Sequence, residues 1–195
     1  MKIKDLKRNL LLAHGFFFPQ KKLPRNPTVM HIDFSFNIYR LDFTTDEVVF
    51  FIINKFKDKV WETYLQERNN KFEIKLFHSE QEACNDFFVS MVNHWAGQDF
   101  DWCPQNITSK NRLYKYLATY MAYHQIEPNV SYKRRLHHSY IEYKHNNSRY
   151  RIIKKGNVWR ICSKTTTLLS TTDVQDFCRY FLQTIRSVHN DNRCA

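Results

Sequence analysis

Basic and aromatic side chains alternate between residues 132 and 160, and this segment is the part of the sequence best suited to bind another molecule. Arginine and lysine can neutralise phosphates or carboxylates, and tyrosine can stack on unpaired bases or anchor a protein interface. The residues expected to contact a partner are Lys133, Arg134, Arg135, Arg149, Tyr150, Arg151, Lys154 and Lys155. The alternative is an ordinary exposed sheet face, on which cross-strand tyrosines and charges only stabilise the sheet.

The net charge of the chain is concentrated in the same half. Over 195 residues the formal charge is +11. Residues 1–97 hold 14 Lys and Arg against 12 Asp and Glu, whereas residues 98–195 hold 16 against 7. Such an excess predicts an anionic partner, which could be nucleic acid, a phosphate-rich surface or an acidic protein. A basic surface that serves only solubility is the other interpretation.

The motifs of common catalytic, nucleotide-binding and metal sites are missing from the sequence. There is no Walker loop, no G-x-G-x-x-G and no H-E-x-x-H, and the chain has only 3 glycines. His137 and His138 are adjacent, so on a strand they would point to opposite faces and could not share one metal. We therefore predict a non-enzymatic protein with no cofactor and no metal.

The cysteines and the apolar runs predict the compartment. The 5 cysteines form no C-x-x-C pair, and their odd number argues against a disulfide framework. We expect free thiols in the cytoplasm. No apolar run approaches the length of a membrane span, so no membrane partner is expected.

The first half of the chain is predicted to fold as helix, four strands, helix. Leu6, Leu10 and Ala13 fall on one face of an N-terminal helix. Strands are expected at 31–36, 48–54, 60–65 and 72–77. The sequence from Ser79 to Glu82 has the pattern of a capping box, and the helix that follows is expected to bury Cys84, Phe87, Phe88, Met91 and Trp95.

The second half is predicted to repeat this order. A helix is expected from about Ser109 to Gln125, followed by strands at 139–144, 149–154, 158–163 and 166–170. Tight turns are expected at Asn146-Asn147 and Gly156-Asn157, because both residue types tolerate positive φ. Thr172 is expected to cap the closing helix, in a second capping box that ends at Gln175.

Individual residues of the two halves also correspond. Trp61 pairs with Trp159 at an offset of 98, and the expected caps pair at an offset of 93. In the closing helices Cys84, Phe87 and Met91 match Cys178, Phe181 and Ile185 at a constant offset of 94. The predicted fold class is therefore α+β, with two tandem helix–four-stranded antiparallel sheet–helix units, 1–97 and 98–195, packed together as one compact body.

This doubled layout resembles the Whirly fold, in which four-stranded sheets each lead into a helix and single-stranded nucleic acid binds across them. The segments FHSEQEACNDFF (77–88) and STTDVQDFCRYF (170–181) also resemble small bacterial immunity proteins of contact-dependent growth inhibition and polymorphic toxin systems. That resemblance implies a cytosolic protein that binds a cognate toxin domain, such as a nuclease, and blocks it. The alternative that the Whirly likeness implies is a single-stranded RNA- or DNA-binding protein.

Overall fold

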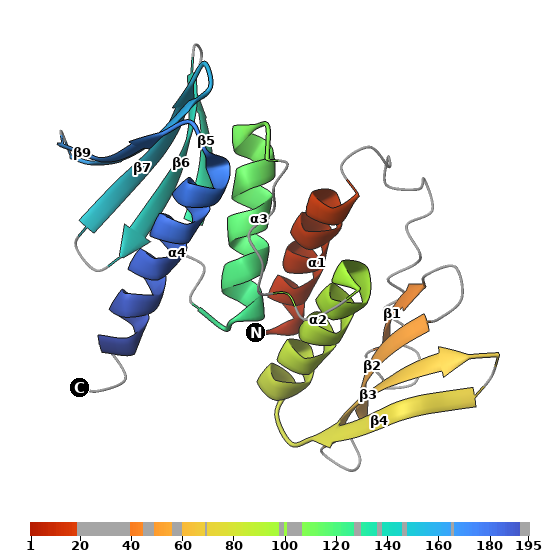
Figure 1. The fold of residues 1–195 in the computed structure, drawn as a ribbon. Coiled ribbons are helices and arrows are strands. Elements are labelled where there is room, and N and C mark those ends of the chain that lie inside the picture. Colours follow the sequence, from red (N-terminus) through yellow and green to blue (C-terminus); the bar gives the residue numbers. More distant parts are fainter. Residues whose placement is uncertain are drawn as a thin grey trace. The chain divides into compact units, whose positions relative to one another are not determined.

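The computed structural model describes residues 1–18, 40–44, 49–55, 60–68, 70–97, 100, 107–126, 130–135, 138–145, 148–164 and 166–191. The chain divides into two compact units, Met1–Phe100 and Asp101–Ala195. In each unit one helix precedes an antiparallel sheet in the sequence and another helix follows it (Figure 1). The predicted α+β class with antiparallel sheets is confirmed. None of the described helices is long and apolar enough to cross a membrane.

The first unit begins and ends with a helix. Its elements are α1 (Ile3–Phe17), β1 (Arg40–Thr44), β2 (Val49–Lys55), β3 (Val60–Glu67), β4 (Asn70–Phe77) and α2 (Glu80–Ala96). The strands pair in the order β1-β2-β3-β4, each antiparallel to its neighbour. The strand predicted at 31–36 lies outside the described residues, and β1 was not predicted from the sequence.

The two helices of the first unit pack together through the side chains that the periodicity selected. Leu6, Leu10 and Ala13 of α1 are buried, as are Cys84 and Phe87 of α2. The predicted cap is confirmed, because Ser79 Oγ accepts a hydrogen bond from the Glu82 amide at 3.2 Å. Glu80 Oε1 accepts from the Ile3 amide at 2.8 Å, so the first turn of α2 also satisfies a free amide at the start of α1.

The second unit has one strand more than the sequence predicted. Its elements are α3 (Lys110–Tyr123), β5 (Val130–Arg135), β6 (His138–His145), β7 (Ser148–Lys155), β8 (Val158–Ser163), β9 (Thr166–Thr171) and α4 (Val174–Asp191). The sheet order is β5-β6-β7-β8-β9, so the predicted four-stranded sheet is wrong. The missed strand is β5, whose run Lys133-Arg134-Arg135 hides the alternation of a strand. Charged side chains suit an edge strand because they discourage unwanted pairing.

The closing helix of the second unit is capped one residue later than predicted. Asp173, not Thr172, is the N-cap: its Oδ1 accepts from the Gln175 amide at 2.7 Å, and its carbonyl accepts from Phe177 at 3.1 Å. Thr171 Oγ1 accepts in turn from the Asp173 amide at 3.1 Å. With this correction the two caps, Ser79 and Asp173, are 94 residues apart. That is the offset of the buried residues in the same helices.

One of the two predicted turns of the second unit lies within the described residues. Gly156 has φ +57°, so the predicted turn before β8 is confirmed, and its left-handed backbone suits glycine. The turn predicted at Asn146-Asn147 lies outside the described residues.

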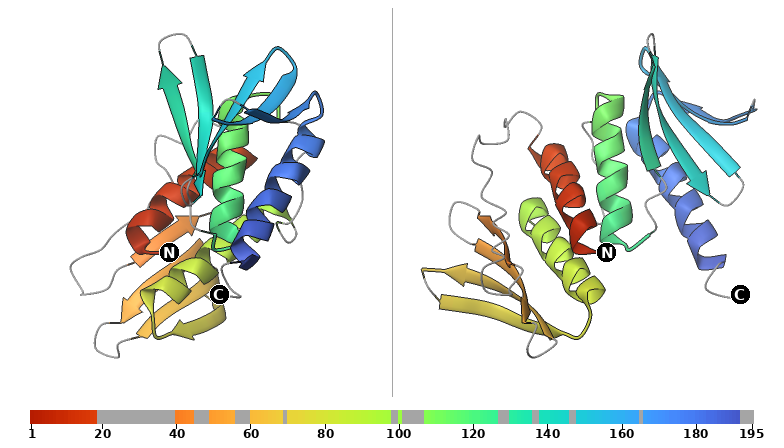
Figure 2. Two further views of the ribbon diagram at one scale, coloured as in Figure 1. Left: turned by 90° about the vertical axis from the view of Figure 1, so that its left-hand side faces the viewer. Right: turned by 180° about the vertical axis from the view of Figure 1, so that it is seen from behind.

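Both helices of the second unit pack on the same face of its sheet (Figure 2). From α3, the Tyr114 ring lies 5.9 Å from that of Tyr132 on β5. From α4, Phe181 meets Tyr143 of β6 at 5.3 Å, and Phe177 meets Trp159 of β8 at 5.7 Å. Register places all three sheet residues on one side, the side of the buried Ile141, Ile152 and Ile161. The opposite side is the outer face of this sheet.

Candidate functional site

The strand register divides the predicted binding residues between the two faces of the second sheet. Lys133 lies opposite Tyr140, Arg151 opposite Glu142 and Lys155 opposite Val158. These positions, together with Arg149, alternate with the core residues and so belong to the outer face. The backbone of Arg135 pairs with that of His138, and the side chain of Arg135 lies outside the described residues.

Three predicted residues, Arg134, Tyr150 and Lys154, belong instead to the helix face. Arg134 is paired with Ser139, Tyr150 with Tyr143, and Lys154 with Trp159. Lys154 Nζ donates to the Thr108 carbonyl at 2.6 Å and lies 4.9 Å from the Trp159 ring. Lys154 therefore links the backbone at Thr108, just before α3, to the sheet.

Tyr150 stacks on Tyr143, with ring centroids 5.8 Å apart. Burial, and then the neighbouring Tyr150, raise the pKa of the Tyr143 hydroxyl to about 12. Tyr143 therefore packs under α4, and Tyr150 packs on Tyr143 rather than on the outer face.

The structure adds two residues of the basic region to the predicted binding residues. Lys144 is paired with Arg149, and Arg160 with Ile153, so both project from the outer face. The outer basic face is formed by Lys133, Lys144, Arg149, Arg151, Lys155 and Arg160. Their basic character is visible in the sequence, but their face follows only from the pairing between strands, because β6 and β8 contain none of the residues already selected.

A tyrosine and a glutamate lie beneath these basic side chains. Tyr140 is 8% exposed and Glu142 is 7% exposed, although both lie on the outer face. The Arg151 guanidinium stands 5.4 Å from the Tyr140 ring centroid, and Lys144 Nζ is 3.7 Å from Glu142 Oε2. Long basic side chains commonly cover apolar surface in this way while their charged ends stay in water.

Glu142 is the single acidic residue between positions 130 and 171, a segment with ten Lys and Arg. The basic charge of the outer face is therefore balanced by one carboxylate only. The positive potential of a surface of this kind attracts anionic partners over distances of about a Debye length, roughly 8 Å at physiological salt.

The interleaved tyrosines are not presented for base stacking. Tyr132 and Tyr143 pack against the helices, and Tyr150 stacks on Tyr143. Tyr140 is on the outer face but is covered by Arg151. Single-stranded nucleic acid binding draws much of its affinity from bases stacked on exposed aromatic rings. Among the residues with described side chains, the outer basic face offers charge without such a ring.

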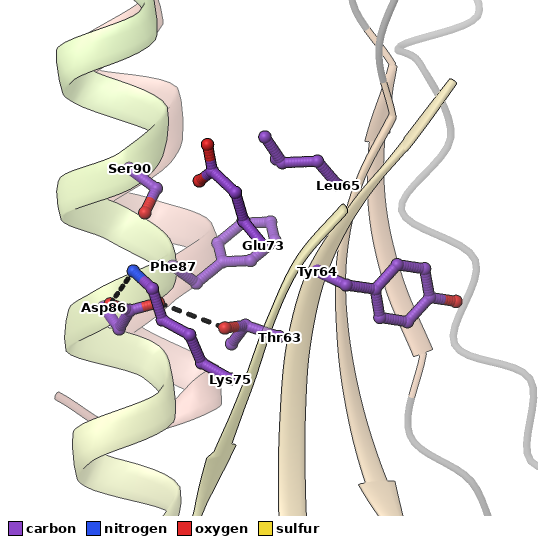
Figure 3. A pocket seen from close by; sticks show the side chains of 8 residues that line it. All are labelled: Thr63, Tyr64, Leu65, Glu73, Lys75, Asp86, Phe87 and Ser90. Carbon is purple, nitrogen blue, oxygen red and sulfur yellow. Dashed lines mark hydrogen bonds and ion pairs between the residues drawn. The ribbon is translucent and has the colours of Figure 1, made fainter. Parts of the chain in front are cut away.

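A small pocket in the first unit lies between β3, β4 and α2 (Figure 3). Asp86 accepts from Lys75 Nζ at 2.8 Å and from Thr63 Oγ1 at 3.1 Å, while Tyr64 points away from α2. Its volume of about 10 Å³ suits one water molecule. This pocket is too small for a substrate, and its polar network fastens α2 to the sheet.

No cluster of three or more His, Cys, Asp or Glu that could hold a metal occurs within the described part of the chain. Comparison with protein families, with curated proteins and with solved structures found no match to this chain.

Proposed function

We propose that this chain is a non-catalytic binding protein of the immunity type. In this proposal it neutralises a cognate toxin domain, such as a nuclease, by placing the outer basic face against an acidic surface of that domain. The observation that carries the proposal is the outer basic face itself, six Lys and Arg side chains around one paired glutamate.

The position of the tyrosines favours an acidic protein over single-stranded nucleic acid. Charge alone would serve either partner, because both carry negative charge. Stacking would serve only the nucleic acid, and Tyr132, Tyr143 and Tyr150 are directed to the core side of the sheet. Single-stranded RNA or DNA binding through the same face is the second candidate, which the charge supports.

An electrostatic face of this kind acts mainly on the rate of association. Complementary charge raises the association rate constant from about 10⁵–10⁶ M⁻¹s⁻¹ to as much as about 10⁸–10⁹ M⁻¹s⁻¹ at low salt. A rapid encounter suits an inhibitor that must reach a toxin before it acts. We expect an interface near the standard size of about 1,600 Å².

We also propose that the two units arose by duplication of one Whirly-like helix–sheet–helix unit. In support, Trp61 and Trp159 are each the second residue of the strand before last. The last hairpin of each unit turns through a non-glycine residue with positive φ, Arg68 at 45° and Lys164 at 50°. Each of these hairpins also contains a register shift, after Thr63 in β3 and after Ile161 in β8.

The test is a toxicity-rescue assay in bacteria. Each gene found beside the one encoding this chain is expressed alone and together with the chain. Rescue is expected from one toxic neighbour, and the double variant Arg149→Glu/Arg151→Glu is expected to weaken it. Lys7→Glu/Arg8→Glu, which changes the charge equally at exposed positions of α1, is the matched control.

Failure to rescue from every neighbour would overturn the immunity proposal. If the chain also bound single-stranded RNA, with an affinity that falls steeply as salt rises, the nucleic-acid function would replace it.

A further inference from the structure

The strand β4 presents large apolar side chains to solvent at the edge of the first sheet. Phe72 is 47% exposed, Ile74 is 54% exposed and Leu76 is 64% exposed. Within the described strands β4 pairs with β3 alone, so it is an edge strand of this sheet. Exposed apolar edges of this kind are templates for pairing with a further strand.

The edges of the second sheet lack this combination. Its first edge strand, β5, carries Lys133 and Arg134 as exposed charges. Its last, β9, is rich in threonine and exposes one large apolar residue, Leu168, at 41%. A preference for strand addition is therefore confined to β4 among the edges whose side chains are described.

We propose that β4 pairs antiparallel with β4 of a second copy of this chain, about a two-fold axis at Ile74. The sequence of the strand is complementary to itself about that residue. In this register Ile74 faces Ile74 of the second copy and Glu73 faces its Lys75, while Phe72 lies beyond the register shift, on the helix side of the sheet. Apolar and opposite-charge pairs of this kind stabilise antiparallel strands.

Neighbouring symmetric registers are disfavoured by charge. An axis at Glu73 would place Glu73 against itself and Lys71 against Lys75 of the second copy. An axis at Lys75 would place that ammonium against itself. Like charges directly opposite one another destabilise a sheet, so these two registers are disfavoured relative to the axis at Ile74.

The backbone limits the strength of this pairing. Glu73 has φ +50°, and the register between β3 and β4 shifts beside it, which marks a bulge that twists the strand. The added pairing is consequently short. We expect a dimer that dissociates on dilution, with Ile74 at its centre.

Sedimentation equilibrium of the full chain tests the proposal. The wild type should show a concentration-dependent monomer–dimer equilibrium, and Ile74→Lys should shift it at least tenfold toward monomer. Leu168→Lys on β9 is the matched control, and it should leave the equilibrium unchanged. A wild type that stays monomeric at every concentration would overturn the proposal, as would equal weakening by the control.

Cysteine substitution tests the register. In the proposed pair the two Ile74 Cα atoms lie roughly 5 Å apart, within disulfide reach. The two Leu76 Cα atoms would be separated by about 13 Å along the strand. Mild oxidation should therefore cross-link Ile74→Cys but not Leu76→Cys. Cross-linking of the second variant and not the first would refute the axis at Ile74.

Discussion

The outer faces of the two sheets both bury a glutamate and a tyrosine beneath basic side chains, but the residues on the neighbouring strands differ. In the first sheet Glu62 and Tyr64 are 4% and 6% exposed beneath Lys71, whose Nζ lies 3.5 Å from Glu62 Oε1 and 4.1 Å from the Tyr64 ring centroid. In the second sheet Tyr140 and Glu142 lie beneath Arg151 and Lys144. Each sheet thus covers a glutamate and a tyrosine, two residues apart, with basic side chains.

The surroundings give the two faces different chemistry. Beside Glu62 and Tyr64, the neighbouring strand offers the exposed Ile74 and Leu76. Beside Tyr140 and Glu142, the neighbouring strands offer further arginine and lysine. The same helix–sheet–helix order therefore supports an apolar edge in one unit and a basic outer face in the other. The difference lies in the surface residues of the strands and not in the fold.

The largest expected effect tests whether the two cores are equivalent. Phe87→Ala and Phe181→Ala each remove a buried ring from a matching position of a closing helix. Each change should lower the free energy of unfolding of its own unit by about 3–5 kcal/mol. Urea denaturation followed by circular dichroism measures both losses. A loss at one position and none at the other would break the correspondence between the units.

A charge reversal on the outer basic face should have the next largest effect. Arg149→Glu/Arg151→Glu should slow association with an acidic partner by about tenfold or more at low salt. Heparin, a sulfated polyanion, is a convenient probe, and this variant should leave a heparin column at lower salt than the wild type. Lys7→Glu/Arg8→Glu should elute later than the outer-face variant. Identical elution would show that only the total charge matters.

Removing the helix caps should have a smaller effect, and it tests whether Asp173 rather than Thr172 is the N-cap of α4. Ser79→Ala and Asp173→Ala each leave an amide of the first turn without its partner, so each should cost about 1 kcal/mol of unfolding free energy. Thr172→Ala should change stability by less than about 0.5 kcal/mol. Thermal or urea denaturation decides between them. A larger loss at Thr172 than at Asp173 would restore the original assignment.

The smallest effect at neutral pH concerns two buried, weakly acidic groups, the Cys84 thiol in the first unit and the Tyr143 hydroxyl in the second. Burial, and then the charge of Glu80, raise the pKa of the Cys84 thiol from 9.0 to about 12, and burial raises that of Tyr143 from 10.0 to about 12. Since the unfolded chain loses these protons first, unfolding becomes easier as pH rises. The first unit should weaken above about pH 9 and the second above about pH 10.

Denaturation midpoints between pH 8 and pH 11 measure this difference. Cys84→Ala should flatten the pH dependence of the first unit and leave that of the second unchanged. A first unit whose stability is independent of pH in the wild type would contradict the buried position of Cys84.

Patterns of buried residues were predicted well from the sequence. Helical periodicity selected Leu6, Leu10 and Ala13, and the later helix residues Phe87 and Phe181, all of which are buried, whereas Trp95, which was also expected to be buried, is only half-buried. These predictions succeeded because a helix buries one face at fixed spacing. Free thiols were also expected, and Cys84, Cys162 and Cys178 are in no disulfide; Cys103 and Cys194 lie outside the described residues.

Edge strands and surfaces were predicted less well. The strand β5 was missed because an edge strand tolerates charge in place of alternation. The strand β4 was found, but its apolar residues are exposed, since alternation shows that a face exists and not what covers it. For the candidate site, the sequence indicated a basic region, but only register separated Lys154 and Tyr150 on the helix face from Arg151 on the outer face.

The most direct test of the central claim is the affinity of this chain for the toxin domain from which it rescues cells. Titration calorimetry at low and physiological salt would compare the wild type with Arg149→Glu/Arg151→Glu and with Lys7→Glu/Arg8→Glu. The outer-face variant is expected to bind at least tenfold more weakly, with a smaller salt dependence, while the α1 variant binds like the wild type. Unchanged affinity of the outer-face variant would contradict the assignment of the outer basic face as the binding surface.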